Sequence, residues 1–349
     1  MKIRTTLISL TPTDASQLIN RYNSFFFQLF EMSNDEMFMV VYSIIGCTVV
    51  LFNVPICVLI YFSKTLRPCK ELVLIGGLCL ADTVQALANI LSGAQRLVLY
   101  AENQANVPET SLRCYVEPFN VLFFFGYHLV GIMTMLVSVD RLIAVLKPVQ
   151  HEIICSRKNG IALTVGTFSF SAIAFLVCLY FQIEYSFDMT RICYGATAYL
   201  PAVWEYVHHI RLIPVLISIA LYLPISYKLY GIMKTQAVGG QYYQNKKMAN
   251  FTKTVGLVSL SALFMLVIPD ILVTYFGDFF GEYKVIFFIT SHTKAIVNIF
   301  IFSLRHSGLR RTLVYIAKTT LGTLTGNRIK IVTVSHVQSI GRSTCAGSR

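Results

Sequence analysis

The chain has 349 residues, of which 55% are hydrophobic and only 13% are charged, and its formal net charge is +12. About a quarter of the residues of a soluble domain are charged, so this composition excludes an ordinary soluble globule and favours a protein embedded in a lipid bilayer. The excess of basic residues falls in loops between apolar segments, which indicates membrane topology rather than nucleic-acid binding.

Seven apolar segments are long enough to cross a bilayer, because about 20 helical residues span its ~30 Å of hydrocarbon. In chain order the predicted spans are residues 37–62, 71–93, 114–145, 160–181, 206–233, 254–275 and 282–304. The seventh has the weakest apolar signal, because His292, Lys294 and Asn298 interrupt it. The sequence therefore predicts an all-α membrane protein, a seven-transmembrane helix bundle over residues 37–304.

The orientation of this bundle follows from its basic loops. Lysine and arginine dominate the loops after the first, third and fifth spans and the C-terminal segment, where Glu152 is the only acid. That side is predicted to be cytoplasmic, so residues 1–36 form an extracellular N-terminus at the plasma membrane. Residues 305–321 are predicted to form a short amphipathic eighth helix on the inner membrane surface, followed by a disordered tail over 322–349.

The cysteine positions predict one disulfide. Of nine cysteines, only Cys114 and Cys193 fall on the outer, oxidising side of the predicted topology. One outer pair with no third cysteine left over favours a single bridge between them, and two free thiols are the alternative.

An acid and a base stand side by side near the inner end of the third span, in the stretch "SVDRLIAVLKPVQH". Asp140 and Arg141 are followed there by Pro148. Other motif residues occur in order along the chain: Asn53, Leu78, Ala81, Asp82, Pro214, Tyr222, Pro269 and Asn298. This set resembles the rhodopsin-like G-protein-coupled receptors over residues 37–320, and it is most similar to the nematode serpentine chemoreceptors of the srsx type.

The resemblance implies a role for each group of residues. Coupling to a heterotrimeric G protein would fall to Asp140, Arg141, Pro148 and Tyr222, with Asp140 holding Arg141 in the quiet receptor. An intramembrane polar core would consist of Asn53, Asp82, Lys294 and Asn298. The candidates for lining an outer ligand cavity are Phe123, Tyr127, Arg211, Asp270 and His292. Arg211 and Asp270 have the alternative of pairing with each other without a ligand role.

Several positions depart from the family pattern. Ile299 and Phe302 replace the proline and tyrosine that follow the family's helix-seven asparagine, and Val267 replaces a helix-six tryptophan. Phe123 stands where amine receptors carry an aspartate, which argues against a biogenic-amine ligand. Cys114 lies about two residues further from Arg141 than is usual, so we expect a distorted outer end of the third helix.

Lys294 is the least typical residue, because a charge inside hydrocarbon costs at least ~2.5–3.5 kcal/mol. Our hypothesis is that its ammonium replaces a sodium ion beside Asp82; the alternatives are an unpaired Lys294 in a watery cavity, or one that binds an acidic ligand.

The chain is thus expected to be a chemosensory receptor whose partners are an extracellular small molecule or peptide, a G protein and membrane lipids. A transporter, a channel or a weakly signalling receptor is the alternative. No enzyme or cofactor is expected, since the sequence shows no nucleophile elbow, no paired carboxylates and no glycine-rich phosphate loop. No metal site is expected either, since His208 and His209 are adjacent and "HEII" after Gln150 lacks a second histidine.

Overall fold

The computed structural model describes residues 34–63, 66, 72–235, 241–280, 284–305, 309–310 and 314. The extracellular segment expected over residues 1–36 lies outside these residues except for its last three. The expected eighth helix over 305–321 lies almost wholly outside them, and so does the tail over 322–349.

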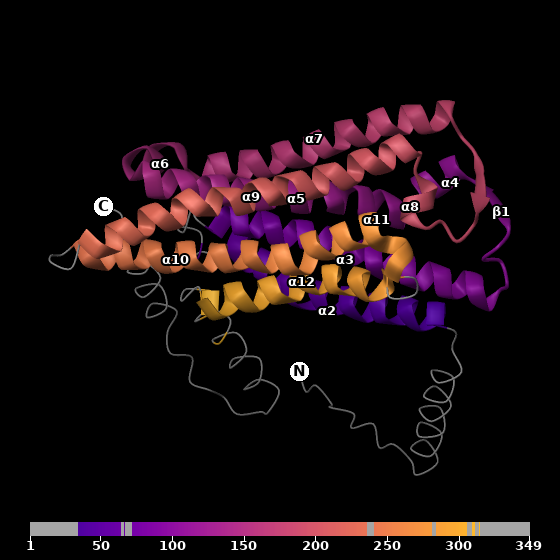
Figure 1. Ribbon diagram of the computed structural model, residues 1–349, viewed down its shortest axis with the longest axis horizontal. Helices are drawn as coiled ribbons and strands as arrows, with labels where there is room; N and C mark the ends of the chain where they lie inside the picture. The colour runs from indigo at the N-terminus through magenta and orange to yellow at the C-terminus, as the bar shows by residue number, and fades with distance from the viewer. Residues whose placement is uncertain are drawn as a thin grey trace, which may run out of the picture.

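Long helices lie side by side along one axis in the described part of the chain (Figure 1). They are α2 (Asn34–Phe62), α3 (Leu72–Ala101), α5 (Pro118–Leu146), α7 (Arg157–Glu184), α9 (Pro201–Thr235), α10 (Gln241–Ala262), α11 (Ile268–Phe280) and α12 (Lys284–Arg305). A π-helical turn, η1 (Leu263–Val267), joins α10 to α11, so these three elements form one bent helix.

Short elements close the two ends of the bundle (Figure 1). The helices α4 (Ser111–Val116) and α8 (Gly195–Ala198) lie at one end with an antiparallel pair of strands, β1 (Pro108–Thr110) and β2 (Asp188–Thr190). We call this the disulfide end. The opposite end carries α6 (Pro148–Ile154), and we call it the α6 end.

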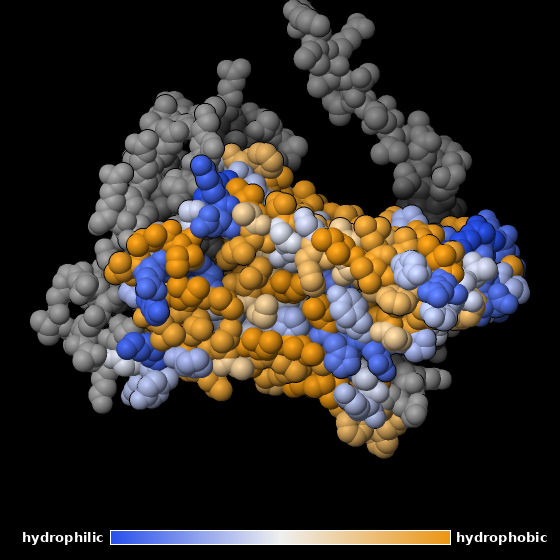
Figure 2. Space-filling view, turned by 90° about the horizontal axis from the view of Figure 1, so that it is seen from above, coloured by the Kyte–Doolittle hydropathy of each residue, from blue (hydrophilic) through white to orange (hydrophobic). Residues whose placement is uncertain are grey.

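Six helical stretches within the described residues are long and apolar enough to cross a membrane. They are Glu36–Phe62, Leu72–Ala101, Pro118–Leu146, Arg157–Glu184, Pro201–Gly231 and Thr252–Phe276. Apolar residues cover most of the face seen in Figure 2, and hydrophilic residues gather mainly toward its ends. Large apolar side chains such as Leu51, Ile173 and Leu223 are exposed on the bundle surface. Such a surface is stable in lipid rather than in water, so the chain is a multi-pass membrane protein.

The seventh predicted span corresponds to α12, which forms a helix of 22 residues. It is not among the six apolar stretches. Its charged and polar residues Lys294, His292 and Asn298 are all buried inside the bundle rather than exposed to lipid.

The sequence predicted one continuous helix over 114–145 for the third span, but the structure has two helices there, α4 and α5. Glu117 has an extended backbone (φ −57°, ψ 135°), and α5 begins at Pro118. A proline disfavours helical geometry in the residue before it, and it fits the first turn of a helix, where its missing N–H is not needed. The helix is therefore interrupted here, and Cys114 lies on the separate helix α4.

The interior is centred on α3, which packs against α2 and α5. Apolar residues of five long helices meet there, including Ile60, Ile75, Leu129, Val258 and Phe302. In lipid, helices associate through close packing of small residues, because there is no water to expel. Gly131 on α5 is one such point, since a Cβ atom there would lie 2.6 Å from the carbonyl oxygen of Ile210 on α9.

Candidate functional site

The α6 end holds a buried ionic cluster. The Arg141 guanidinium donates from Nε to Oδ2 of Asp140 at 2.9 Å, and its Nη2 atom forms an ion pair with the same oxygen. The other carboxylate oxygen, Oδ1, lies 3.0 Å from Nε2 of His151. Exposure is 2% for Arg141, 9% for Asp140 and 7% for His151, so the cluster is shielded from solvent.

The helix α6 positions His151 in this cluster. Pro148 is its first residue, where proline is favoured, and three residues later His151 faces the end of α5. His151 was not among the residues predicted for this site. Its position one turn after Pro148 was the available signal, but only the packing of α6 on α5 shows the contact.

A row of buried hydroxyls lies one turn further into the bundle. Ser138 Oγ is 2.5 Å from Ser218 Oγ, which is 3.2 Å from Ser259 Oγ. This row joins α5, α9 and α10 and was not recognised from the sequence. Tyr222, one turn beyond Ser218, is directed at α10, because a Cβ atom at Gly256 would lie 3.4 Å from its ring.

Three of the four predicted polar-core residues meet at mid-bundle. The Lys294 ammonium lies 3.8 Å from Oδ1 of Asp82. The Asn298 amide donates to Oδ2 of Asp82 at 3.3 Å and its oxygen accepts from Ser261 at 3.4 Å. Asn53 is 1% exposed, but its amide atoms form no hydrogen bond within the described residues.

A small cavity lies directly above this core, toward the disulfide end. It has a volume of about 30 Å³, which is room for a water molecule or two. Residues of the polar core and predicted ligand residues line it together. The lining includes Asp82 and Lys294 of the core, the predicted ligand residues Tyr127, Arg211 and His292, and also Asn89.

Two of the predicted ligand residues form an ion pair across helices. Arg211 Nε on α9 lies 3.4 Å from Oδ2 of Asp270 on α11, and both side chains are less than one tenth exposed. The guanidinium also lies over the Tyr127 ring, 4.6 Å from its centroid. Phe123 contacts Tyr127, with 5.9 Å between ring centroids, but it does not line the cavity. The same ion pair is therefore expected whether Arg211 and Asp270 bind a ligand or only join two helices.

His292 lies on the other wall of the cavity. Its Nδ1 atom is 3.1 Å from the amide nitrogen of Asn89 on α3, so it accepts that hydrogen bond. The oxygen of the Asn89 amide is buried and has no partner within the described residues. Polar groups thus face the cavity with hydrogen-bonding capacity left over.

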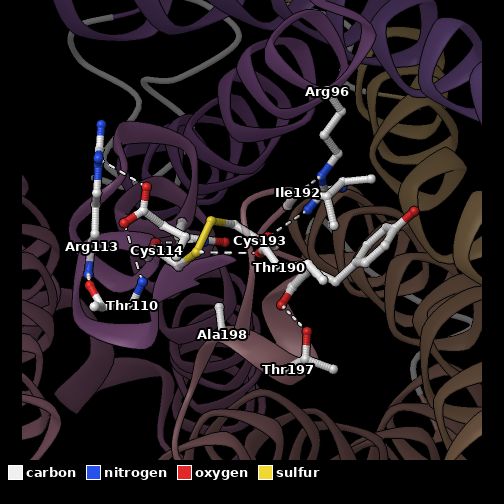
Figure 3. Close-up of a disulfide and its surroundings, with 12 residues drawn as sticks. Arg96, Thr110, Arg113, Cys114, Thr190, Ile192, Cys193, Thr197 and Ala198 are labelled. Carbon is white, nitrogen blue, oxygen red and sulfur yellow. Dashed lines mark hydrogen bonds and ion pairs between the residues drawn. A yellow bond between two sulfur atoms is a disulfide. The ribbon is translucent and has the colours of Figure 1, made fainter. Parts of the chain in front are cut away.

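The predicted disulfide between Cys114 and Cys193 is present and ties the segment before α8 to α4 (Figure 3). Cys193 has a φ of 51°, a conformation that costs energy for a residue other than glycine. The bridge is buried with Phe119 and Ala198.

Arg96 holds the same segment from the α3 side, as Figure 3 shows. It donates from Nε to the Ile192 carbonyl at 3.1 Å and from Nη2 to the Cys193 carbonyl at 2.9 Å. Its guanidinium lies 4.7 Å from the Tyr194 ring centroid. Arg96 lies beyond the predicted second span, which ended at residue 93, whereas α3 continues to Ala101.

Tyr199, which lies between α8 and α9, makes a further contact at the disulfide end. The Tyr199 hydroxyl donates to the Asn120 carbonyl at 2.8 Å. Burial raises the pKa of Tyr199 well above its ordinary value, so the hydroxyl remains a donor throughout the physiological range.

Comparison with known proteins assigns the family. No curated protein matches the chain. The sequence pattern of the family described as "Serpentine type 7TM GPCR chemoreceptor Srsx" matches residues 43–314, which include the α6-end cluster, the polar core and both cysteines. Because this match covers most of the chain, the protein belongs to the Srsx family of serpentine seven-transmembrane chemoreceptors.

Proposed function

We propose that the protein is a chemosensory receptor that binds an extracellular small molecule or peptide near its disulfide end and activates a heterotrimeric G protein at its α6 end. The observation that carries the proposal is the arrangement of α5. This helix, roughly 40 Å long, carries Tyr127 of the cavity toward one end and the buried Asp140–Arg141 pair at the other.

The orientation is supported by charge and redox chemistry. Disulfides persist in oxidising compartments, so the end with the Cys114–Cys193 bridge is assigned to the outside of the cell. Loops rich in lysine and arginine favour the cytoplasm, which assigns the α6 end to the inside. We place the receptor in the plasma membrane, with α12 as the seventh span, an eighth helix after it and the N-terminus outside.

The cavity supports a small polar ligand rather than an amine. Its walls present the Arg211 guanidinium, whose partner Asp270 lies behind the lining, and the partly satisfied amide of Asn89. A volume of about 30 Å³ holds only water, so ligand binding requires the outer ends of α9, α11 and α12 to separate. That separation would be transmitted to the α6 end through the helices themselves.

The role of Arg141 follows from its burial. An arginine held by a neighbouring carboxylate in a water-poor site is released only when the surrounding helices move. In the proposed active state the guanidinium leaves Asp140 and contacts the G protein. The free energy of ligand binding would thus be used to break a buried ion pair.

Nucleotide exchange on purified heterotrimeric G proteins tests the proposal. The full-length receptor in lipid nanodiscs is screened against small molecules and peptides, and a hit should accelerate exchange in the parent protein. Ligand-dependent ion current or solute flux without nucleotide exchange would instead identify a channel or transporter and overturn the proposal.

A further inference from the structure

Three side chains with different donor atoms converge at the α6 end. They are Asp140 from α5, His151 from α6 and Cys155, the residue that caps α6. Their carboxylate oxygen, imidazole nitrogen and sulfur atoms all lie within 4.8 Å of one another. Nε2 of His151 lies 3.0 Å from Oδ1 of Asp140.

Local helical geometry aligns two of the three donors. His151 and Cys155 are four residues apart, and the Cys155 amide donates to the His151 carbonyl at 2.8 Å. Residues with this spacing project from the same face of a helix, an arrangement that metal sites use repeatedly. Cys155 carries a thiol and not a disulfide.

Asp140 can supply the third donor atom and still keep its ion pair with Arg141. Its Oδ2 atom receives the guanidinium, whereas Oδ1 faces His151. An ion bound at Oδ1 therefore leaves the Asp140–Arg141 contact in place. The arginine also compensates the carboxylate from the far side, so the site is not an uncompensated acidic cluster.

The site has room beside it. A cavity of about 110 Å³ lies between α5, α6 and α7, and all three donor residues line it together with Ser156 and Asn159. This volume accommodates an ion and a coordinated water molecule. The donors do not have to be exposed by unfolding, because the cavity already reaches them.

The donor set selects the metal. Zinc prefers sulfur, nitrogen and carboxylate ligands in a tetrahedron, whereas calcium and magnesium prefer sites made of oxygen. Donor atoms around a tetrahedral zinc ion lie roughly 3–4 Å apart, so the present 4.8 Å limit requires only small side-chain rotations. Three protein ligands would leave a fourth position for water.

We propose that Asp140, His151 and Cys155 form a zinc-binding site that fastens α6 to α5. The ion takes the place of the proton between His151 Nε2 and Asp140 Oδ1. The imidazole binds the ion through Nε2 in its neutral form with one proton on Nδ1, and any proton in excess of that one leaves to solvent. The Cys155 thiol loses its proton to solvent when its sulfur binds the ion. This site reverses the expectation of no metal, which considered α6 by itself and therefore lacked Asp140.

The test uses full-length receptor in nanodiscs, stripped with a chelator and titrated with zinc. We expect about one zinc ion per chain and a rise in the thermal unfolding midpoint on zinc addition. Cobalt should also bind and show the near-ultraviolet charge-transfer absorption of a thiolate ligand. The cobalt spectrum is recorded on the parent protein and does not depend on whether any variant folds.

Variants then assign the ligands. Cys155→Ser and His151→Gln should each weaken zinc binding by at least about tenfold, and Cys155→Ser should abolish the thiolate absorption. Matched controls are Cys47→Ser, on the exposed face of α2, and His209→Gln, on the exposed face of α9. The proposal is overturned if the parent binds no more zinc than Cys155→Ser does, or if bound cobalt lacks the thiolate absorption. None of these readouts depends on a ligand or a G protein, so they are independent of the proposed receptor function.

Discussion

The Lys294 ammonium on α12 lies 3.8 Å from a carboxylate oxygen of Asp82 on α3, with the two side chains 2% and 5% exposed. Both groups are in the middle of a bundle where an isolated charge is costly. Asn298 donates to the second oxygen of Asp82, and so the carboxylate has a partner on each side. This geometry is consistent with the hypothesis that an internal cation occupies the place of a sodium ion.

A double-mutant cycle tests that hypothesis. Asp82→Asn and Lys294→Ser should each destabilise the purified receptor by ~3–5 kcal/mol, because each leaves the other charge buried without its partner. The double variant should recover part of this loss, and millimolar sodium should not raise the unfolding temperature of the parent. Strictly additive single changes, or stabilisation of the parent by sodium, would exclude the pairing.

Removal of the buried guanidinium should separate coupling from ligand binding. Arg141→Ala is expected to abolish ligand-driven nucleotide exchange while surface expression and ligand affinity persist, since Arg141 is not part of the cavity lining and lies about 20 Å along α5 from Tyr127. Lys147→Ala is the matched control, because Lys147 is an exposed basic residue near the same end. Unchanged exchange in Arg141→Ala would refute the role assigned to the ion pair.

The two bridged cysteines should behave as one unit. Cys114→Ser, Cys193→Ser and the double variant should lose surface expression to the same degree, and a bridge of this kind typically contributes ~2–5 kcal/mol. Cell-surface labelling measures the loss, with Cys47→Ser as the control. A double variant clearly worse than either single one would show that the cysteines also act separately.

Arg96 should be as important to the disulfide end as the bridge itself. Arg96→Ala removes two charge-assisted hydrogen bonds to the carbonyls of Ile192 and Cys193, each worth about 1.5–3 kcal/mol, so proteolysis of the segment around Cys193 should become faster.

The matched control for Arg96 is Arg113→Ala. The Arg113 side chain is 59% exposed and pairs with Glu109 at 2.9 Å, an exposed contact expected to contribute at most about 1 kcal/mol. Equal protease sensitivity of the two variants would argue against a specific anchoring role for Arg96.

Features that depend on one stretch of chain were predictable from the sequence. Apolar segments of bilayer length predicted the helices, because backbone groups in lipid must be satisfied within each segment. The cysteine count predicted the bridge, since topology leaves one pair on the oxidising side. The break before α5 was only anticipated as a distortion, although Pro118 marks its position.

Contacts between helices were decided by the tertiary structure. His151 meets Asp140, Arg96 meets Ile192 and Cys193, and Ser138 meets Ser218 only because the helices adopt particular rotations and approach within a few ångströms. Helical periodicity determines which side chains share a face, but it does not determine which face of another helix they meet. The Lys294–Asp82 approach was foreseen only because the family resemblance placed both helices around one cavity. Asp140 was assigned to Arg141 alone from the sequence, whereas folding gives its second oxygen to His151 and brings Cys155 beside it, because α6 packs back onto the end of α5.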